Sequence, residues 1–89
     1  MTSDSFWHVY IVQCSDGSLY TGIAKDLQQR IKNHNSDNGG AKYTRPRRPV
    51  FLVYHEKAPD RSAAAKREHE IKKMTAAAKR TLTNTPQKI

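Results

Sequence analysis

Apolar and polar positions near the start of the chain follow the pattern of a β-hairpin. From Trp7 to Val12 the residues alternate with a period of two, which is typical of a strand with two distinct faces. β-Prone residues resume from Leu19 to Ile23. Between these segments, residues 15–18 read SDGS, a turn signal, because glycine tolerates positive φ and aspartate can bond its own backbone.

The length of this turn decides which side chains share a face of the sheet. A two-residue Asp-Gly loop pairs Tyr10 with Ile23 and places Tyr10 and Tyr20 on opposite faces. A three-residue Ser-Asp-Gly loop, with Gly17 in the left-handed conformation, pairs Tyr10 with Gly22. Both tyrosines then share one face, beside a glycine that leaves open space. A slip of one residue moves every side chain to the other face, so the two registers exclude each other.

The rest of the pattern predicts one more strand and three helices. A continuous apolar run indicates a central third strand, and a capping residue precedes each helical segment. The expected elements are a helix over 27–35 behind Asp26, a strand over 50–54, a helix from Asp60 or Ser62 to about Met74, and a helix over 76–82 behind Thr75. We expect one α/β domain of the α+β type over residues 7–82, a mainly antiparallel three-stranded sheet flanked by helices. A polar leader over 1–6 and a tail over 83–89 complete the chain.

The first predicted helix carries two pairs of residues at a spacing of four. Leu27 and Ile31 should face the core, and Arg30 and His34 lie one step around the helix, at the border with solvent. The planar guanidinium of Arg30 matches the oxygens of a phosphodiester and its transition state. His34 is a candidate for phosphate binding or proton transfer. The alternatives are a surface arginine and a structural histidine.

In the second long helix an acidic residue interrupts the apolar face. Ala64, Ile71 and Met74 form a stripe at spacings of three and four, and Glu68 falls within it, whereas Glu70 falls on a solvated face. A carboxylate that faces inward is costly unless it is paired, hydrogen-bonded or bound to a metal. Glu68 is therefore either half of a salt bridge to a cation of the first helix or a ligand for Mg²⁺ or Mn²⁺. No second carboxylate is spaced to share the site, which favours one ion over two.

The net charge of the chain indicates a polyanionic partner. The 89 residues carry a formal net charge of +8, which favours nucleic acid first and an anionic membrane second. A proline-containing segment concentrates part of this charge around one tyrosine: Lys42, Tyr43, Arg45, Arg47 and Arg48. We expect these residues to bind a phosphate backbone, with Tyr43 available to stack on a base. The alternative is a solubilising loop.

The remaining composition indicates a cytoplasmic protein. Cys14 is the single cysteine, so an internal disulfide is excluded, and a buried thiol at a strand end is expected. No apolar run approaches the ~20 residues of a membrane span, and no signal-peptide pattern is visible.

The order of these residues resembles a known family. Val9-Tyr10-Ile11 followed by Tyr20-Thr21-Gly22 resembles the paired motifs of the GIY-YIG endonuclease superfamily. The later landmarks match in order: Arg30, His34 and Glu68. The resemblance covers residues 7–82 and is closest to the small stand-alone bacterial members.

The resemblance implies a metal-dependent phosphodiester hydrolase. Tyr20 is then the favoured general base, with Tyr10 in support, and Gly22 lets phosphate or a helix approach the strand. A phenol ionises at a pKa of ~10, so a base of this kind needs a nearby cation or metal; tyrosines that simply pack are the alternative. Some members, including the repair incision subunit, carry a lysine directly after the second-motif glycine. Here that position is Ile23, and Lys25 lies two residues further on.

Three functions are open at this point. The first is a Mg²⁺- or Mn²⁺-dependent endonuclease acting on DNA in repair or recombination, including branched, nicked or single-stranded forms, with RNA as an alternative. The second is a non-catalytic nucleic-acid-binding module that keeps the fold. The third is a protein-interaction domain whose charge is incidental. The complete set of candidate side chains favours the first. No protein partner is inferable, and a monomer is expected.

Overall fold

The computed structural model describes residues 6–36, 42 and 44–83. The expected leader and tail, apart from Phe6 and Thr83, and the candidate Tyr43 lie outside the described residues. The described chain forms β1 (Trp7–Gln13), β2 (Leu19–Ala24), α1 (Leu27–His34), the 3₁₀ helix η1 (Arg45–Arg47), β3 (Phe51–Ala58), α2 (Arg61–Lys72) and α3 (Ala76–Thr83). The predicted α+β class is confirmed. Within these residues no helix has the length and apolar character needed to cross a bilayer.

The sheet has the order β2-β1-β3, and β1 pairs antiparallel with both neighbours. The middle of β1, from Val9 to Val12, is 0% exposed because both faces of this strand are covered. The expectation of a central third strand is therefore wrong: β3 is an edge strand, and Phe51 and Leu52 are 61% and 38% exposed. An apolar run alone does not distinguish an edge strand from a central strand, because that distinction depends on whether hydrogen-bonded neighbours lie on one side of the strand or on both.

The hairpin turn has three residues, as the second of the two registers requires. Cys14 N donates to Ser18 O over 2.8 Å, and Gly17 N donates to Cys14 O over 2.9 Å. Gly17 has a φ of 86°, in the left-handed region that favours glycine. Tyr10 consequently pairs with Gly22. The alternative two-residue turn is excluded.

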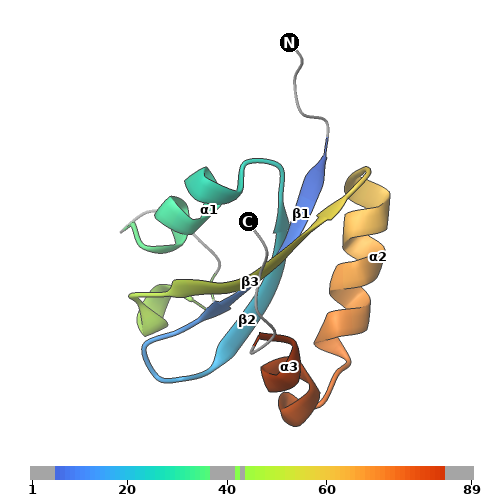
Figure 1. Ribbon diagram of the computed structural model, residues 1–89. Coiled ribbons are helices and arrows are strands. Elements are labelled where there is room, and N and C mark those ends of the chain that lie inside the picture. The colour runs from blue at the N-terminus through green and yellow to red at the C-terminus, as the bar shows by residue number, and fades with distance from the viewer. Residues whose placement is uncertain (1–5, 37–41, 43, 84–89) are drawn as a thin grey trace.

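Helices cover both faces of this sheet (Figure 1). On one face α1 packs Leu27 and Ile31 against a buried cluster: Tyr10, Val12, Cys14, Ala24 and Val50. On the other face α2 and α3 cover a second cluster: Val9, Ile11, Ala58, Ala64 and Ile71. The predictions for the core face of the first helix and for a buried Cys14 are confirmed.

Each of the described α-helices begins at an N-cap that the sequence predicts. Asp26 accepts a hydrogen bond from Gln29 N over 3.0 Å, and Asp60, rather than Ser62, accepts one from Ala63 N over 2.8 Å. Thr75 Oγ1 accepts one from Ala78 N over 3.1 Å. These caps satisfy N–H groups that have no partner inside the helix, and they fix where α1 and α2 begin relative to the sheet.

Candidate active site

Gly22 is required by the phenol of Tyr10. A Cβ built on Gly22 would lie 2.5 Å from Tyr10 Oη and 2.7 Å from Tyr10 Cζ, closer than real Cβ contacts allow. The expectation of open space beside Gly22 is wrong, because the ring of Tyr10 fills the space that a side chain at this position of β2 would occupy. The glycine thus admits a neighbouring tyrosine rather than a phosphate or a helix.

The hydroxyl of Tyr10 connects β1 to α1. Arg30 Nε donates to Tyr10 Oη over 3.3 Å, and Tyr10 Oη lies 2.7 Å from His34 Nε2. The other ring nitrogen, His34 Nδ1, lies 2.9 Å from Thr44 Oγ1. Arg30 is partly buried, as expected, but His34 and Thr44 are both 0% exposed. The border position predicted for His34 is therefore wrong, because the segment after α1 returns over the imidazole.

The protons of this network follow from burial. Burial, together with the positive charge of Arg30, lowers the pKa of His34 from 6.5 to about 4, so the ring is neutral at pH 7 and has one donor and one acceptor. Since Tyr10 Oη accepts from Arg30, the Tyr10 O–H is best placed to donate to His34 Nε2, and His34 Nδ1–H then donates to Thr44 Oγ1. Burial also raises the pKa of Tyr10, although Arg30 opposes this. Tyr10 and His34 therefore position Arg30 and are poorly suited to exchanging protons with solvent.

Tyr20 shares the face of Tyr10 but keeps exposed surface. Its ring centroid lies 5.5 Å from that of His34, and the Tyr10 ring lies 5.7 Å from the same imidazole. Tyr10 is 0% exposed, whereas Tyr20 is half-buried. Of the two phenols, that of Tyr20 is therefore the one that solvent can reach. The roles expected of Tyr20 as general base and of Tyr10 in support stay a prediction.

Glu68 enters the site from α2 and is paired within its own helix. Lys72 Nζ lies 3.3 Å from Glu68 Oε2, and the two side chains are 50% and 23% exposed. The alternative of a salt bridge to the first helix is wrong, since the partner lies four residues further along α2. Burial is the main cause of the raised pKa of Tyr10, and the negative charge of Glu68 makes a minor contribution in the same direction. Glu70 is exposed and pairs with Arg67 over 3.2 Å, which confirms its solvated position.

Lys72 is a site residue that the sequence reasoning missed. Its ammonium lies 5.8 Å from the centroid of the Tyr20 ring, so it stands close to both the carboxylate and the phenol. The available signal was its position four residues after Glu68 on one helix, the spacing at which a carboxylate and an ammonium meet.

The site is assembled at the outer edge of β2. The strand order makes β2 an edge strand, and Figure 1 shows α1 and α2 on opposite sides of the sheet. Side chains from both helices can meet the tyrosines only where the sheet ends. Arg30 thus comes from one side, and Glu68 and Lys72 from the other.

The donor set fits a divalent ion that substrate helps to hold. Among the described residues, no three His, Cys, Asp or Glu side chains gather as a metal-binding group. Glu68 offers a partly buried carboxylate whose lysine partner is half exposed. Mg²⁺ is commonly bound by one or two carboxylates, waters and substrate phosphates, and this arrangement suits such a site.

The basic segment has internal as well as outward contacts. Arg47 Nε pairs with Asp16 Oδ2 over 3.1 Å, and Arg48 donates to Ser36 O over 2.7 Å. Lys42 and Arg45 are exposed. Two arginines and two prolines line a hollow of about 450 Å³ together with one asparagine: Arg45, Arg48, Pro46, Pro49 and Asn35.

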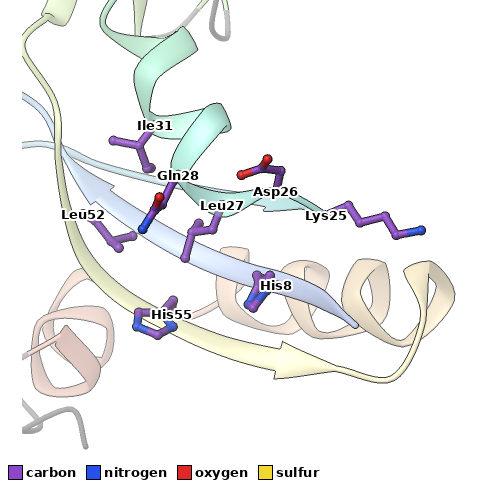
Figure 2. A pocket seen from close by; sticks show the side chains of 8 residues that line it. All are labelled: His8, Lys25, Asp26, Leu27, Gln28, Ile31, Leu52 and His55. Atoms are coloured by element: carbon purple, nitrogen blue, oxygen red, sulfur yellow. The ribbon is translucent and has the colours of Figure 1, made fainter. Parts of the chain in front are cut away.

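A separate hollow of about 670 Å³ lies between α1 and β3. Figure 2 shows Leu27 and Leu52 pointing into it from these two elements, with His8 and His55 on the sheet beside them. Lys25 belongs to this hollow and extends away from it in Figure 2. None of the predicted catalytic residues lines it, so the hollow and the tyrosine site are distinct places.

Comparison with known sequences gives matches over most of the chain. The model of the GIY-YIG catalytic domain matches residues 6–81. A UPF0213 protein of Desulfotalea psychrophila is 56% identical over 82 residues, which are 92% of this chain and 74% of that protein. A UPF0213 protein of Staphylococcus aureus is 61% identical over 67 residues, 75% of this chain and 80% of its own length.

Two solution NMR structures are similar to this fold. A UPF0213 protein of Bacillus halodurans is 43% identical, with a TM-score of 0.55 over 86% of this chain and 81% of that chain. A protein of E. faecalis is 36% identical, with a TM-score of 0.59 over 92% of this chain and 88% of that chain. The sequence matches and the structural matches therefore both include UPF0213 proteins.

Proposed function

This chain belongs to the GIY-YIG family, a family of endonuclease-like catalytic domains, and we propose that it is a divalent-metal-dependent phosphodiester hydrolase acting on DNA. The observation that carries the proposal is the fixed guanidinium of Arg30, held by Tyr10 beside a partly exposed Tyr20 and opposite Glu68. A positioned cation can bind the phosphate, a phenol can act as general base and a carboxylate can hold a metal ion, so the three groups together suit hydrolysis of a phosphodiester.

Arg30 binds the scissile phosphate in this proposal. Its Nε is occupied by Tyr10, and within the described residues its two terminal nitrogens have no protein hydrogen-bond partner. They can therefore donate as a planar fork to two phosphate oxygens, and the charge is fixed before the transition state forms. His34 contacts Tyr10, and Thr44 contacts His34, so both act on the phosphate only through Tyr10 and Arg30.

Tyr20 orients and deprotonates the attacking water. The phenol needs a neighbouring positive charge to ionise, and Lys72 stands 5.8 Å from its ring centroid. Glu68 would hold the Mg²⁺ or Mn²⁺ ion, which when bound supplies positive charge to the phosphate oxygens and to water. One ion is proposed because, in the part of the chain that the structure describes, Glu68 is the single carboxylate placed among these residues.

DNA is the proposed substrate because the chain is basic. A net charge of +8 on 89 residues favours a polyanion, and Lys42 and Arg45 are exposed at the proposed phosphate-binding segment. RNA satisfies the same electrostatics and is the alternative substrate. A monomer in the cytoplasm stays a prediction from the sequence.

A second candidate function has an observation of its own. Tyr10 and His34 are fully buried and hydrogen-bonded, so these two motif residues are accounted for by the fold even without catalysis. A nucleic-acid-binding module that does not cut would keep both residues for that reason.

A cleavage screen separates the two candidates. Duplex, single-stranded, flap and junction DNA and RNA are incubated with the protein in Mg²⁺, Mn²⁺ or EDTA, with Glu68→Gln as the matched variant. Hydrolysis is expected for at least one substrate, supported by a divalent ion and abolished by EDTA and by Glu68→Gln. Clear binding without cleavage under every condition would favour the binding module.

A further inference from the structure

The two faces of the sheet are covered unequally. Among the described elements, α2 and α3 lie on one face, whereas α1 alone lies on the other. A helix is about 10 Å across and neighbouring strands lie about 4.8 Å apart, so one helix covers about two strands. β3 is therefore only partly covered on the α1 face, and the hollow of about 670 Å³ lies there. Its volume is typical of a ligand-binding pocket.

The walls of this hollow are aliphatic and aromatic. Leu27, Ile31 and Leu52 line it from α1 and β3, and Leu52 is 38% exposed. The imidazoles of His8 and His55 lie on the sheet side (Figure 2). Such walls suit a flat, partly apolar ligand, because its faces can stack on an imidazole ring and be buried against aliphatic groups.

His8 brings a ring nitrogen without a partner to this hollow. Its Nδ1 is buried and forms no hydrogen bond within the described residues, although nearly all buried polar atoms in proteins form one. The imidazole can turn about its Cβ–Cγ bond, which exchanges the sides that its nitrogens and carbons face. A ligand with a polar edge can therefore supply the missing partner.

The rim of the hollow offers groups for the edge and the charge of a ligand. Gln28 is exposed there, and its amide can both donate and accept, as the edge of a nucleobase requires. Lys25 is exposed and extends away from the hollow in Figure 2, so its ammonium faces solvent beside the opening. The acidic residue of this rim, Asp26, is engaged as the N-cap of α1. A flat base inside the hollow with a phosphate outside it matches this distribution.

We propose that the hollow between α1 and β3 holds one unpaired base of a nucleic-acid strand, with Lys25 on its phosphate. The inference rests on the proposed function and narrows its substrate to nucleic acid with an unpaired nucleotide. Nucleic acid is chosen among flat ligands because the chain has a net charge of +8. The base must leave a duplex to enter, since stacking and pairing cover its faces and its edge.

The hollow and the proposed phosphate site belong to the same two turns of one helix. Arg30 lies between Leu27 and Ile31 in the sequence of α1, and α1 is about 10 Å across. One strand can therefore place a base in the hollow and a nearby phosphate at Arg30. The consequence is a preference for DNA that has an unpaired nucleotide close to the cut.

Affinity measured in EDTA tests this site without cleavage. The DNA is a duplex with a short single-stranded overhang, and each overhang nucleotide is replaced in turn by an abasic residue, which keeps the phosphate and removes the base. At one position this replacement should weaken binding by wild type about fivefold or more, the effect of losing one stacked base. Wild type without any such position would overturn the proposal.

Two neighbouring residues of β3 provide matched variants. Leu52→Glu places a carboxylate in the hollow, and Phe51→Glu places one on the adjacent residue, which is 61% exposed and does not line the hollow. The effect of the abasic residue should disappear in Leu52→Glu and persist in Phe51→Glu. A base effect that survives in Leu52→Glu, or that is lost in both variants, would overturn the proposal.

The phosphate contact is tested separately at two exposed lysines. Lys25→Met should reduce the dependence of affinity on salt by about one unit of the logarithmic slope, because one phosphate contact is lost. Lys32→Met, on α1 but outside the hollow, is the matched control and should leave the slope unchanged. Equal slopes in the two variants would remove Lys25 from the site. Because no readout needs cleavage, failure here is distinguishable from an inactive nuclease.

Discussion

At Gly22 the site depends on the absence of a single carbon atom. The phenol of Tyr10 lies where the Cβ of any other residue would be, and its hydroxyl forms hydrogen bonds with Arg30 and His34. An added methyl group therefore acts on the geometry of Arg30 without touching the guanidinium. The motif glycine and the motif tyrosine are one packing unit, contributed by two paired strands.

We expect Gly22→Ala to destabilise the fold by about 1–3 kcal/mol, because the phenol must leave its place in a packed core. Cleavage per folded molecule should fall as well, because Arg30 loses its hydrogen bond. Urea unfolding together with activity of the folded fraction measures both. Gly17→Ala is the control: its cost comes from a φ of 86° with no atom within 4 Å, so it should lower stability and leave activity per folded molecule intact. A stable Gly22→Ala with full activity would refute the packing account.

The buried imidazole of His34 predicts a dependence of stability on pH. Its pKa falls from 6.5 to about 4 on folding, so the unfolded chain binds the proton more readily. The stabilisation is therefore complete above about pH 6.5 and is lost as pH falls towards 4, by on the order of 2–3 kcal/mol. Urea unfolding of wild type and His34→Gln across this range measures it. The difference between the two proteins should shrink as pH falls, and a constant difference would show that His34 titrates normally.

At the scale of elements, α2 brings its charged residues to the site by helical spacing. Glu68 and Lys72 follow one another at a separation of four and reach the edge of β2, whereas Glu70 turns away to Arg67. The hydrophobic pattern placed Glu68 on the inner side of this helix but gave no information on its partner. The partner depends on side-chain reach past the strand edge, which the spacing of apolar residues does not encode.

Glu68→Gln should change the free energy of unfolding by less than about 0.5 kcal/mol, because a pair within one helix at this exposure contributes little. No buried cation is stranded, since Lys72 is half exposed. Mg²⁺-supported cleavage should be lost while DNA binding is kept. Glu70→Gln is the matched control and should be near neutral in thermal unfolding and in cleavage. Marked destabilisation by Glu68→Gln with intact cleavage in the folded fraction would instead make the carboxylate structural.

At the scale of the whole molecule, the period-2 pattern, the caps and the turn predicted the elements, and the glycine-containing turn limited the register to two alternatives, of which the structure has the second. The strand order was missed, because the run from Val50 to Tyr54 is as apolar as a central strand and yet lies at an edge. The depth of His34 was missed because Thr44, which contacts its imidazole, lies outside the helix on the segment that follows α1. The local sequence pattern determines which face of an element a side chain lies on. Its burial and its partners depend on the residues that other parts of the chain bring against it.

The proposed function depends most directly on Arg30, where the effect of charge can be separated from that of geometry. Arg30→Lys keeps the positive charge and loses both the planar fork and the Nε contact with Tyr10. The measurement is the single-turnover rate of Mn²⁺-supported cleavage, on the DNA that wild type cuts best, beside the melting temperature of each protein. We expect the rate to fall by about 100-fold or more, as for the loss of one preorganised transition-state donor, with the melting temperature nearly unchanged. A large fall in melting temperature with a normal rate per folded molecule would contradict the account and make Arg30 a structural residue.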